Sequence, residues 1–201
     1  MRYRRFGKTE LRLSIFSLGT MRYLASDTNA WEVVQKAVAL GINHIETAQG
    51  YGNSETYLGQ ALRAGVGVPR DQLYLTSKIP PSGDASTVDR AIDTSLERLG
   101  VDYLDGLAIH GVNTPAHLDW VRAETGGMAA VQGAIADGRV RHLGVATHGS
   151  LELILETLHT GLFEFVNLHY YLFFQRHAAA IALAHQMDLG IFIISPGDKG
   201  G

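Results

Sequence analysis

Four side chains that can take part in proton transfer each lie at or just after the end of an expected strand. They are Glu46 and Tyr51 in the segment 45–52, Lys78 at the end of 73–78, and His110 at the end of 104–110. In a parallel barrel the carboxyl ends of successive strands converge on one mouth, and active sites lie there. A carboxylate, a phenol, an ammonium and an imidazole in one mouth can carry out acid–base chemistry.

Reduction of a carbonyl group by hydride is a reaction that suits this set. Charge builds up on the carbonyl oxygen, so a proton donor and a cation nearby lower the barrier. Tyr51 is a weak acid, but a Lys78 ammonium about 4 Å away would favour the ionised phenol by up to roughly 4 kcal/mol at an effective dielectric constant of 20. Glu46 can pair with Lys78, and His110 can orient the carbonyl oxygen or share the proton transfer.

Each of the four residues also has an ordinary structural explanation. A tyrosine in a glycine-rich loop is commonly packed or half-exposed, a strand-end lysine is commonly solvated, and a histidine before glycine commonly hydrogen-bonds within a loop. Glu46 could be a buried carboxylate that Lys78 neutralises. The shared placement of all four at strand ends favours the catalytic interpretation.

The segments that must position these residues alternate between strand-like and helix-like patterns. Apolar strand-like runs occur near 15–18, 42–46, 73–78, 104–110, 143–147, 163–168 and 190–195. Between them lie amphipathic stripes, one of which follows a capping box formed by Ser86 and Asp89 and stops at Gly100. Such alternation predicts a parallel sheet covered by helices.

A barrel is favoured over an open doubly wound sheet. No G-x-G-x-x-G motif follows the first strand, and polar residues lie at nearly every strand end. About seven strands are present where a closed barrel of this kind has eight. We therefore expect residues 1–201 to form a single α/β domain, a (β/α)8 TIM-type barrel that is incomplete at its carboxyl end. The segment 6–10 predicts an N-terminal β-hairpin.

Composition narrows the functional classes. The chain is 46% hydrophobic and 18% charged, with a net charge of -3, which argues against a nucleic-acid or membrane surface. It has no cysteine, which excludes disulfides and thiolate-bound metals or clusters and favours a cytoplasmic location. The nine histidines show no H-E-x-x-H spacing, so no metal site is expected.

Short motifs surround the four residues along the chain, namely Arg5-Phe6-Gly7-Lys8-Thr9, Leu18-Gly19-Thr20-Met21, the segment 46–52 with Asn53-Ser54-Glu55, Thr76-Ser77-Lys78 and Ile109-His110. They occur in the same order in the aldo-keto reductases, a family that the sequence resembles along essentially its whole length. The resemblance implies a (β/α)8 barrel with NADPH, or alternatively NADH, bound across its mouth. Glu46, Tyr51, Lys78 and His110 take the places of the catalytic tetrad, with Tyr51 as the proton donor.

The resemblance also implies where the cofactor binds. The cofactor residues would be Gly19, Thr20, Thr147, His148, Asn167 and Ser195. Independently of the resemblance, Met21 and Tyr23 follow the first main strand and are expected to line the pocket of a small carbonyl substrate. A protein partner is not identified. Near the end, 194–201 is similar to a branch of the family that carries a ferredoxin-like carboxyl-terminal region.

Several positions depart from the family pattern. Glu46 replaces the usual Asp, Thr147-His148 the usual Ser-Asn, Asn167 the usual Gln, and Ile194 the aromatic residue that stacks on the nicotinamide. The expected function is NADPH-dependent reduction of aldehydes or ketones to alcohols. Two alternatives remain open, a cofactor-sensing or partner-binding barrel with little or no turnover, and an inactive fragment of a larger reductase. A glycosidase is disfavoured, because Asp102 and Asp105 begin or lie inside the strand ending at His110.

Overall fold

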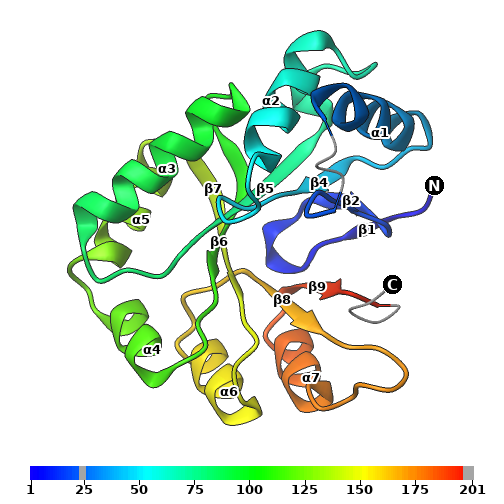
Figure 1. Ribbon diagram of the computed structural model, residues 1–201. Helices are drawn as coiled ribbons and strands as arrows, with labels where there is room; N and C mark the ends of the chain where they lie inside the picture. The colour runs from blue at the N-terminus through cyan, green and yellow to red at the C-terminus, as the bar shows by residue number, and fades with distance from the viewer. Residues whose placement is uncertain (23–25, 197–201) are drawn as a thin grey trace.

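Seven parallel strands, arranged in chain order, form the larger sheet of the computed structural model, which describes residues 1–22 and 26–196 (Figure 1). The strands are β3 (Leu18–Gly19), β4 (His44–Glu46), β5 (Tyr74–Ile79), β6 (Leu104–His110), β7 (Val140–Ala146), β8 (Phe165–His169) and β9 (Gly190–Ile194). All neighbouring pairs are parallel, so their carboxyl ends lie at one edge. The sheet curls into a half-barrel, as the sequence pattern predicted.

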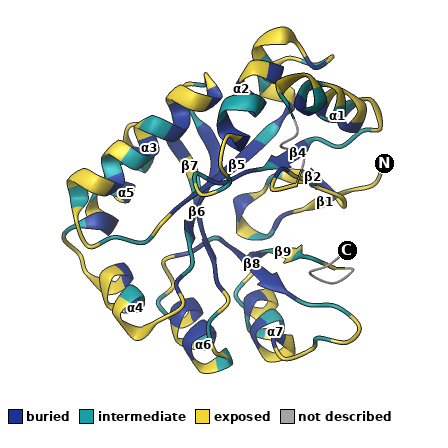
Figure 2. Cartoon of the chain, viewed as in Figure 1, coloured by how far each residue is buried: buried dark blue, intermediate teal, exposed yellow. Residues whose placement is uncertain are grey.

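Helices cover the outer, convex face of this sheet (Figure 1). They are α1 (Asp27–Ala39), α2 (Ser54–Ala64), α3 (Ala85–Leu99), α4 (Pro115–Arg122), α5 (Gly127–Ala136), α6 (Leu151–His159) and α7 (Ala178–Gln186), with a 3-10 turn η2 (Arg70–Gln72) before β5. The strands are mostly buried, and the exposed residues gather on the outward faces of the helices (Figure 2). Within the described ranges, no helix combines the length and apolar character needed to cross a membrane.

The start of α3 differs from the expected capping box. Asp84 is the N-cap, and its carboxylate accepts a hydrogen bond of 2.7 Å from the Thr87 amide. The Ser86 hydroxyl donates to the same carboxylate at 2.8 Å instead of capping the helix. The prediction was therefore wrong by two residues, because the acidic side chain upstream competes successfully for the first free amides. The predicted stop at Gly100, which has φ +66°, is confirmed.

The N-terminal hairpin covers the end of the half-barrel opposite the mouth. Its strands β1 (Tyr3–Arg5) and β2 (Arg12–Ser14) pair antiparallel, joined through the 3-10 turn η1 (Gly7–Thr9). Phe6 is buried, with its ring centroid 4.3 Å from that of Phe192 and 5.7 Å from that of Phe165. The predicted hairpin is thus confirmed, and the Phe6 ring fills the interior of the half-barrel at this end.

Candidate active site

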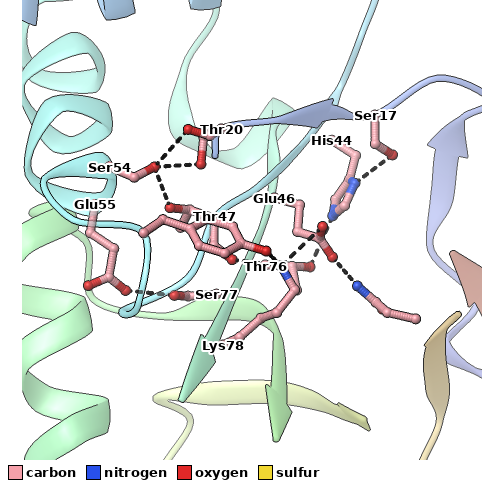
Figure 3. A network of polar contacts seen from close by, with 12 residues as sticks. Ser17, Thr20, His44, Glu46, Thr47, Ser54, Glu55, Thr76, Ser77 and Lys78 are labelled. Carbon is pink, nitrogen blue, oxygen red and sulfur yellow. Dashed lines mark hydrogen bonds and ion pairs between the residues drawn. The ribbon is translucent and has the colours of Figure 1, made fainter. Parts of the chain in front are cut away.

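Lys78 is a buried lysine, and its ammonium group has an oxygen partner for each of its three N–H groups. Its side chain is 2% exposed and projects from β5 toward the mouth. The Nζ atom lies 3.1 Å from Glu46 Oε2, and it donates to the carbonyl of Thr47 at 3.0 Å and to the hydroxyl of Tyr51 at 3.3 Å. Three N–H groups thus meet three oxygens, which offsets the cost of burying the charge. Figure 3 shows Glu46 and Lys78 turned toward each other.

Tyr51 reaches Lys78 from the turn between β4 and α2. Its backbone amide bonds to the carbonyl of Ala48 at 3.0 Å, and Gly52 adopts φ +58°, which lets the chain turn into α2. Because the hydroxyl oxygen accepts from Lys78, the phenolic proton can point to another acceptor. The Lys78 ammonium also lies 4.9 Å from the centroid of the Tyr51 ring.

His110, at the end of β6, meets Tyr51 edge-on. The ring centroids are 5.7 Å apart and the rings are inclined by 86°. Burial, then the nearby Lys78 ammonium and to a lesser degree His148, lowers the pKa of His110 to about 4, against an opposing effect of Glu46. The imidazole is therefore neutral at pH 7 and has one N–H to donate.

Glu46 is held from two sides. Its Oε1 accepts a hydrogen bond from the side-chain amide of Asn167 on β8, while its Oε2 faces Lys78. Asn167 is fully buried, and its Oδ1 has no hydrogen-bond partner among the described residues. A buried acceptor without a donor is uncommon in folded proteins, and a bound group is one explanation for it.

His44 lies in the interior two residues before Glu46, on the same face of β4, and sequence reasoning missed it. Its Nδ1 is 2.8 Å from the Ser17 hydroxyl and its Nε2 is 3.0 Å from the Thr76 hydroxyl (Figure 3). The ring stacks on Phe192 with centroids 4.6 Å apart. Burial lowers the pKa of His44 to about 4, so it is a neutral part of the core. The period of two along a strand was the available signal.

Gly19 ends β3 at the mouth, and Thr20 follows it. A hydroxyl chain fixes Thr20, since Ser54 Oγ donates to Thr20 Oγ1 at 2.6 Å and lies 2.8 Å from Thr47 Oγ1 (Figure 3). The space beside the Gly19 Cα is open to at least 4 Å. Of the predicted pocket residues, Met21 is 45% exposed, whereas Tyr23 lies outside the described residues.

The loop after β7 is organised by Asn113, which sequence reasoning also missed. The Asn113 Oδ1 accepts from the backbone amide of His148 at 2.7 Å. The Thr147 hydroxyl donates to the carbonyl of Val112 at 2.7 Å and accepts from the Gly149 amide at 3.0 Å. The side chain of Thr147 therefore stabilises the conformation of the loop. The only sequence signal for Asn113 was its position three residues after His110.

Two further regions complete the mouth. Ser195, after β9, is half-buried and has φ +51°, an uncommon conformation for a residue with a side chain. His148 and His169 lie with ring centroids 4.7 Å apart.

In the part of the chain that the structure describes, no three His, Cys, Asp or Glu side chains are arranged to hold a metal ion.

Comparisons with known proteins agree with this architecture. The profile of the Aldo/keto reductase family matches residues 16–197. An aldo-keto reductase of Mycolicibacterium smegmatis is 39% identical over 133 residues, which cover 64% of this chain and 43% of that protein. The L-glyceraldehyde 3-phosphate reductase of Escherichia coli O157:H7 is 29% identical over 180 residues, covering 79% and 49%. The chain spans about half the length of the curated relatives that it matches.

Solved structures share the fold of this chain. An aldo/keto reductase from Brucella melitensis superposes with a TM-score of 0.79 at 24% identity, covering 96% of this chain and 72% of that one. A Bombyx mori aldo-keto reductase in complex with NADP gives a TM-score of 0.76 at 21% identity, covering 96% and 66%. The curled parallel sheet and its helices thus define a protein of the barrel class. The chain belongs to the aldo/keto reductase family.

Proposed function

We propose that this chain carries the active site of an NADPH-dependent oxidoreductase that reduces small aldehydes or ketones to alcohols. The observation that carries the proposal is the geometry at Tyr51. Its hydroxyl oxygen accepts from the buried Lys78 ammonium at 3.3 Å, so the cation stabilises the negative charge that the phenol gains as it gives up its proton. A donor placed in this way typically contributes about 10²–10⁴-fold to the rate.

The other two residues of the set have distinct parts in this proposal. Glu46 lies 3.1 Å from Lys78 and keeps the ammonium oriented toward the phenol. His110 is uncharged at pH 7, because burial lowers its pKa to about 4. A neutral imidazole beside Tyr51 donates one hydrogen bond to the carbonyl oxygen of a substrate and does not compete with Tyr51 as an acid.

The residues at the mouth fit a nicotinamide cofactor. The unpartnered Oδ1 of Asn167 suits the carboxamide N–H of a nicotinamide, and the open space at Gly19 allows close approach to the strand. Four further residues follow strands at the same edge of the sheet and would hold the rest of the cofactor, namely Thr20, Thr147, His148 and Ser195. When bound, NADPH supplies the hydride. Membership of the aldo/keto reductase family supports this choice of cofactor.

The experiment is steady-state oxidation of NADPH by the purified chain with a panel of aldehydes and ketones, comparing the parent with Tyr51→Phe. We expect the substitution to lower kcat by at least about 100-fold, since it removes the donor. Tyr57→Phe on α2 removes a hydroxyl elsewhere and is the matched control, with kcat unchanged. Equal activity of the parent and Tyr51→Phe would refute the assignment of Tyr51 as the acid.

Binding of cofactor without turnover is a second candidate, and the sheet topology favours it. Among the described residues, β3 and β9 each have a strand neighbour on one side only, so the mouth is not bounded by strands all the way round. Titration of NADPH, followed by nicotinamide fluorescence and by melting temperature, separates the two. Saturable binding with no reduction of any carbonyl supports the second candidate, whereas no binding by a cooperatively melting chain contradicts both.

A further inference from the structure

We propose that Asn167 is a positioning residue that holds the Glu46 carboxylate against Lys78 from across the half-barrel. The two residues are 121 positions apart in the sequence, on β8 and β4, which are separated in the sheet by β5, β6 and β7. Their hydrogen bond therefore crosses the interior of the curl and does not follow a strand ladder. This inference rests on the proposed function, since it concerns the arrangement of the proposed proton donor.

The two oxygens of Glu46 are divided between two partners. Oε2 faces the Lys78 ammonium at 3.1 Å, and Oε1 accepts from the Asn167 amide. A glutamate side chain has considerable rotamer freedom, and one contact alone leaves its carboxylate free to rotate away. With donors on both sides the carboxylate is fixed, and Lys78 keeps its anionic neighbour while it contacts Tyr51.

The orientation of the Asn167 amide follows from the same contact. The nitrogen must face Glu46, because an amide oxygen in that place would meet a carboxylate oxygen with no proton between them. This turns Oδ1 to the other side, where it is buried without a partner among the described residues. A ligand N–H bound at Oδ1 would be linked to Glu46 through one planar group, and hydrogen bonds in such a chain strengthen one another.

The contact requires side chains of matched length. Shortening Glu46 to aspartate withdraws the carboxylate by roughly 1.5 Å, about one C–C bond, so it cannot keep both partners. We expect it to stay with the Lys78 cation, because a charged partner binds it more strongly, and to lose the hydrogen bond from Asn167. Lengthening Asn167 to glutamine drives its amide into the carboxylate. The two changes together add to one side chain the length that the other loses, so we expect the hydrogen bond to form again. If the two residues act through this contact, the double variant should be more active than either single variant. If they act independently, the two losses of activity should multiply.

The experiment compares the parent, Glu46→Asp, Asn167→Gln and the double variant in NADPH-dependent carbonyl reduction. We expect each single change to lower kcat/KM about tenfold and the double variant to recover to within about threefold of the parent. Asn113→Gln adds the same methylene to an amide that bonds to His148, and we expect no rescue when it is combined with Glu46→Asp. A loss of about 100-fold in the Glu46→Asp, Asn167→Gln variant, the product of the single effects, would overturn the proposal.

A second measurement reports the contact without relying on turnover. The side-chain amide protons of Asn167 are identified by nuclear magnetic resonance from their disappearance in Asn167→Asp. In the parent the two resonances should be widely separated, because one proton bonds to a carboxylate. In Glu46→Asp they should lie closer together. In the double variant the side-chain amide resonances of residue 167, now glutamine, should be widely separated again. Unchanged Asn167 resonances in Glu46→Asp would refute the positioning role. Absence of turnover together with the expected resonances would refute only the proposed function.

Discussion

Arg5 and Asp188 form a two-fold ion pair although 183 residues separate them. Arg5 Nη1 lies 2.7 Å from Asp188 Oδ1, and Nη2 lies 2.7 Å from Oδ2. Arg5 ends β1, and Asp188 lies two residues before β9, the last strand of the sheet. At the other end of β1, the hydroxyl of Tyr3 donates to the carbonyl of Gly41, three residues before β4, at 2.9 Å. The hairpin therefore connects the beginning and the end of a sheet whose outer strands, β3 and β9, do not pair with each other.

The tightest point of this connection is Gly7. It has φ +55°, and a Cβ there would lie 2.3 Å from the backbone nitrogen of Gly190. We expect Gly7→Ala to lower the free energy of unfolding by about 2–5 kcal/mol, from the left-handed backbone and the overpacking together. Gly133→Ala in α5 is the matched control, because its Cβ would meet nothing within 4 Å, and it should stabilise by about 0.8 kcal/mol. Urea denaturation measures both, and similar effects of the two changes would contradict the close packing at Gly7.

Phe6 supplies the apolar part of the same connection. Its ring is buried against Phe192 and Phe165. Phe6→Ala should cost about 3–5 kcal/mol of unfolding free energy, the usual range for removing a buried aromatic ring. Phe173, which is 88% exposed, offers the control, and Phe173→Ala should change stability by less than about 0.5 kcal/mol. If the denaturant midpoints of the two variants coincided, the packing of the Phe6 ring would not contribute to stability.

The buried pair of Lys78 and Glu46 predicts a strong non-additivity. Lys78→Met leaves a carboxylate that is 12% exposed without its cation and should destabilise by about 3–5 kcal/mol at pH 7. Adding Glu46→Gln removes the uncompensated charge and keeps an oxygen that can accept from Asn167. The double variant should therefore be more stable than Lys78→Met alone. A double-mutant cycle from chemical denaturation tests this, and strictly additive losses would show that the two groups do not interact.

Acid should destabilise the fold through two histidines, the buried His44 and the partly buried His110. Burial lowers the pKa values of His44 and His110 to about 4, below the unfolded value near 6.5. Between about pH 6.5 and 4 the unfolded chain binds protons that the folded chain does not, so stability is present above pH 6.5 and is lost as the pH falls. For the fully buried His44 the slope is about 1.4 kcal/mol per pH unit. Denaturation of His44→Gln between pH 5 and 7 should show a shallower slope than the parent, and an equal slope would refute this origin.

Much of the fold is encoded locally and was predictable from the sequence. Alternating apolar runs and amphipathic stripes gave the seven strands of the large sheet, and the segment 6–10 gave the hairpin. The errors concern the bounds of elements, since β3 is Leu18–Gly19 where 15–18 was expected and β7 begins at Val140 where 143 was expected. They also include a helix start that depends on competition between neighbouring polar groups. The helix start at Ala85 is an example, since Asp84 and Ser86 can both cap a helix and only the folded backbone decides between them.

The sequence by itself determined which chemical groups stand at the carboxyl ends of the strands, because the position of Lys78 or His110 on its strand is a local property of the chain. Only the tertiary structure decided which distant groups meet inside. The bond from Asn167 to Glu46 and the stacking of His44 on Phe192 join opposite sides of the curl. Such contacts depend on how far the sheet bends and on which side chains fill the interior. Both result from packing over the whole chain, and no local pattern records them.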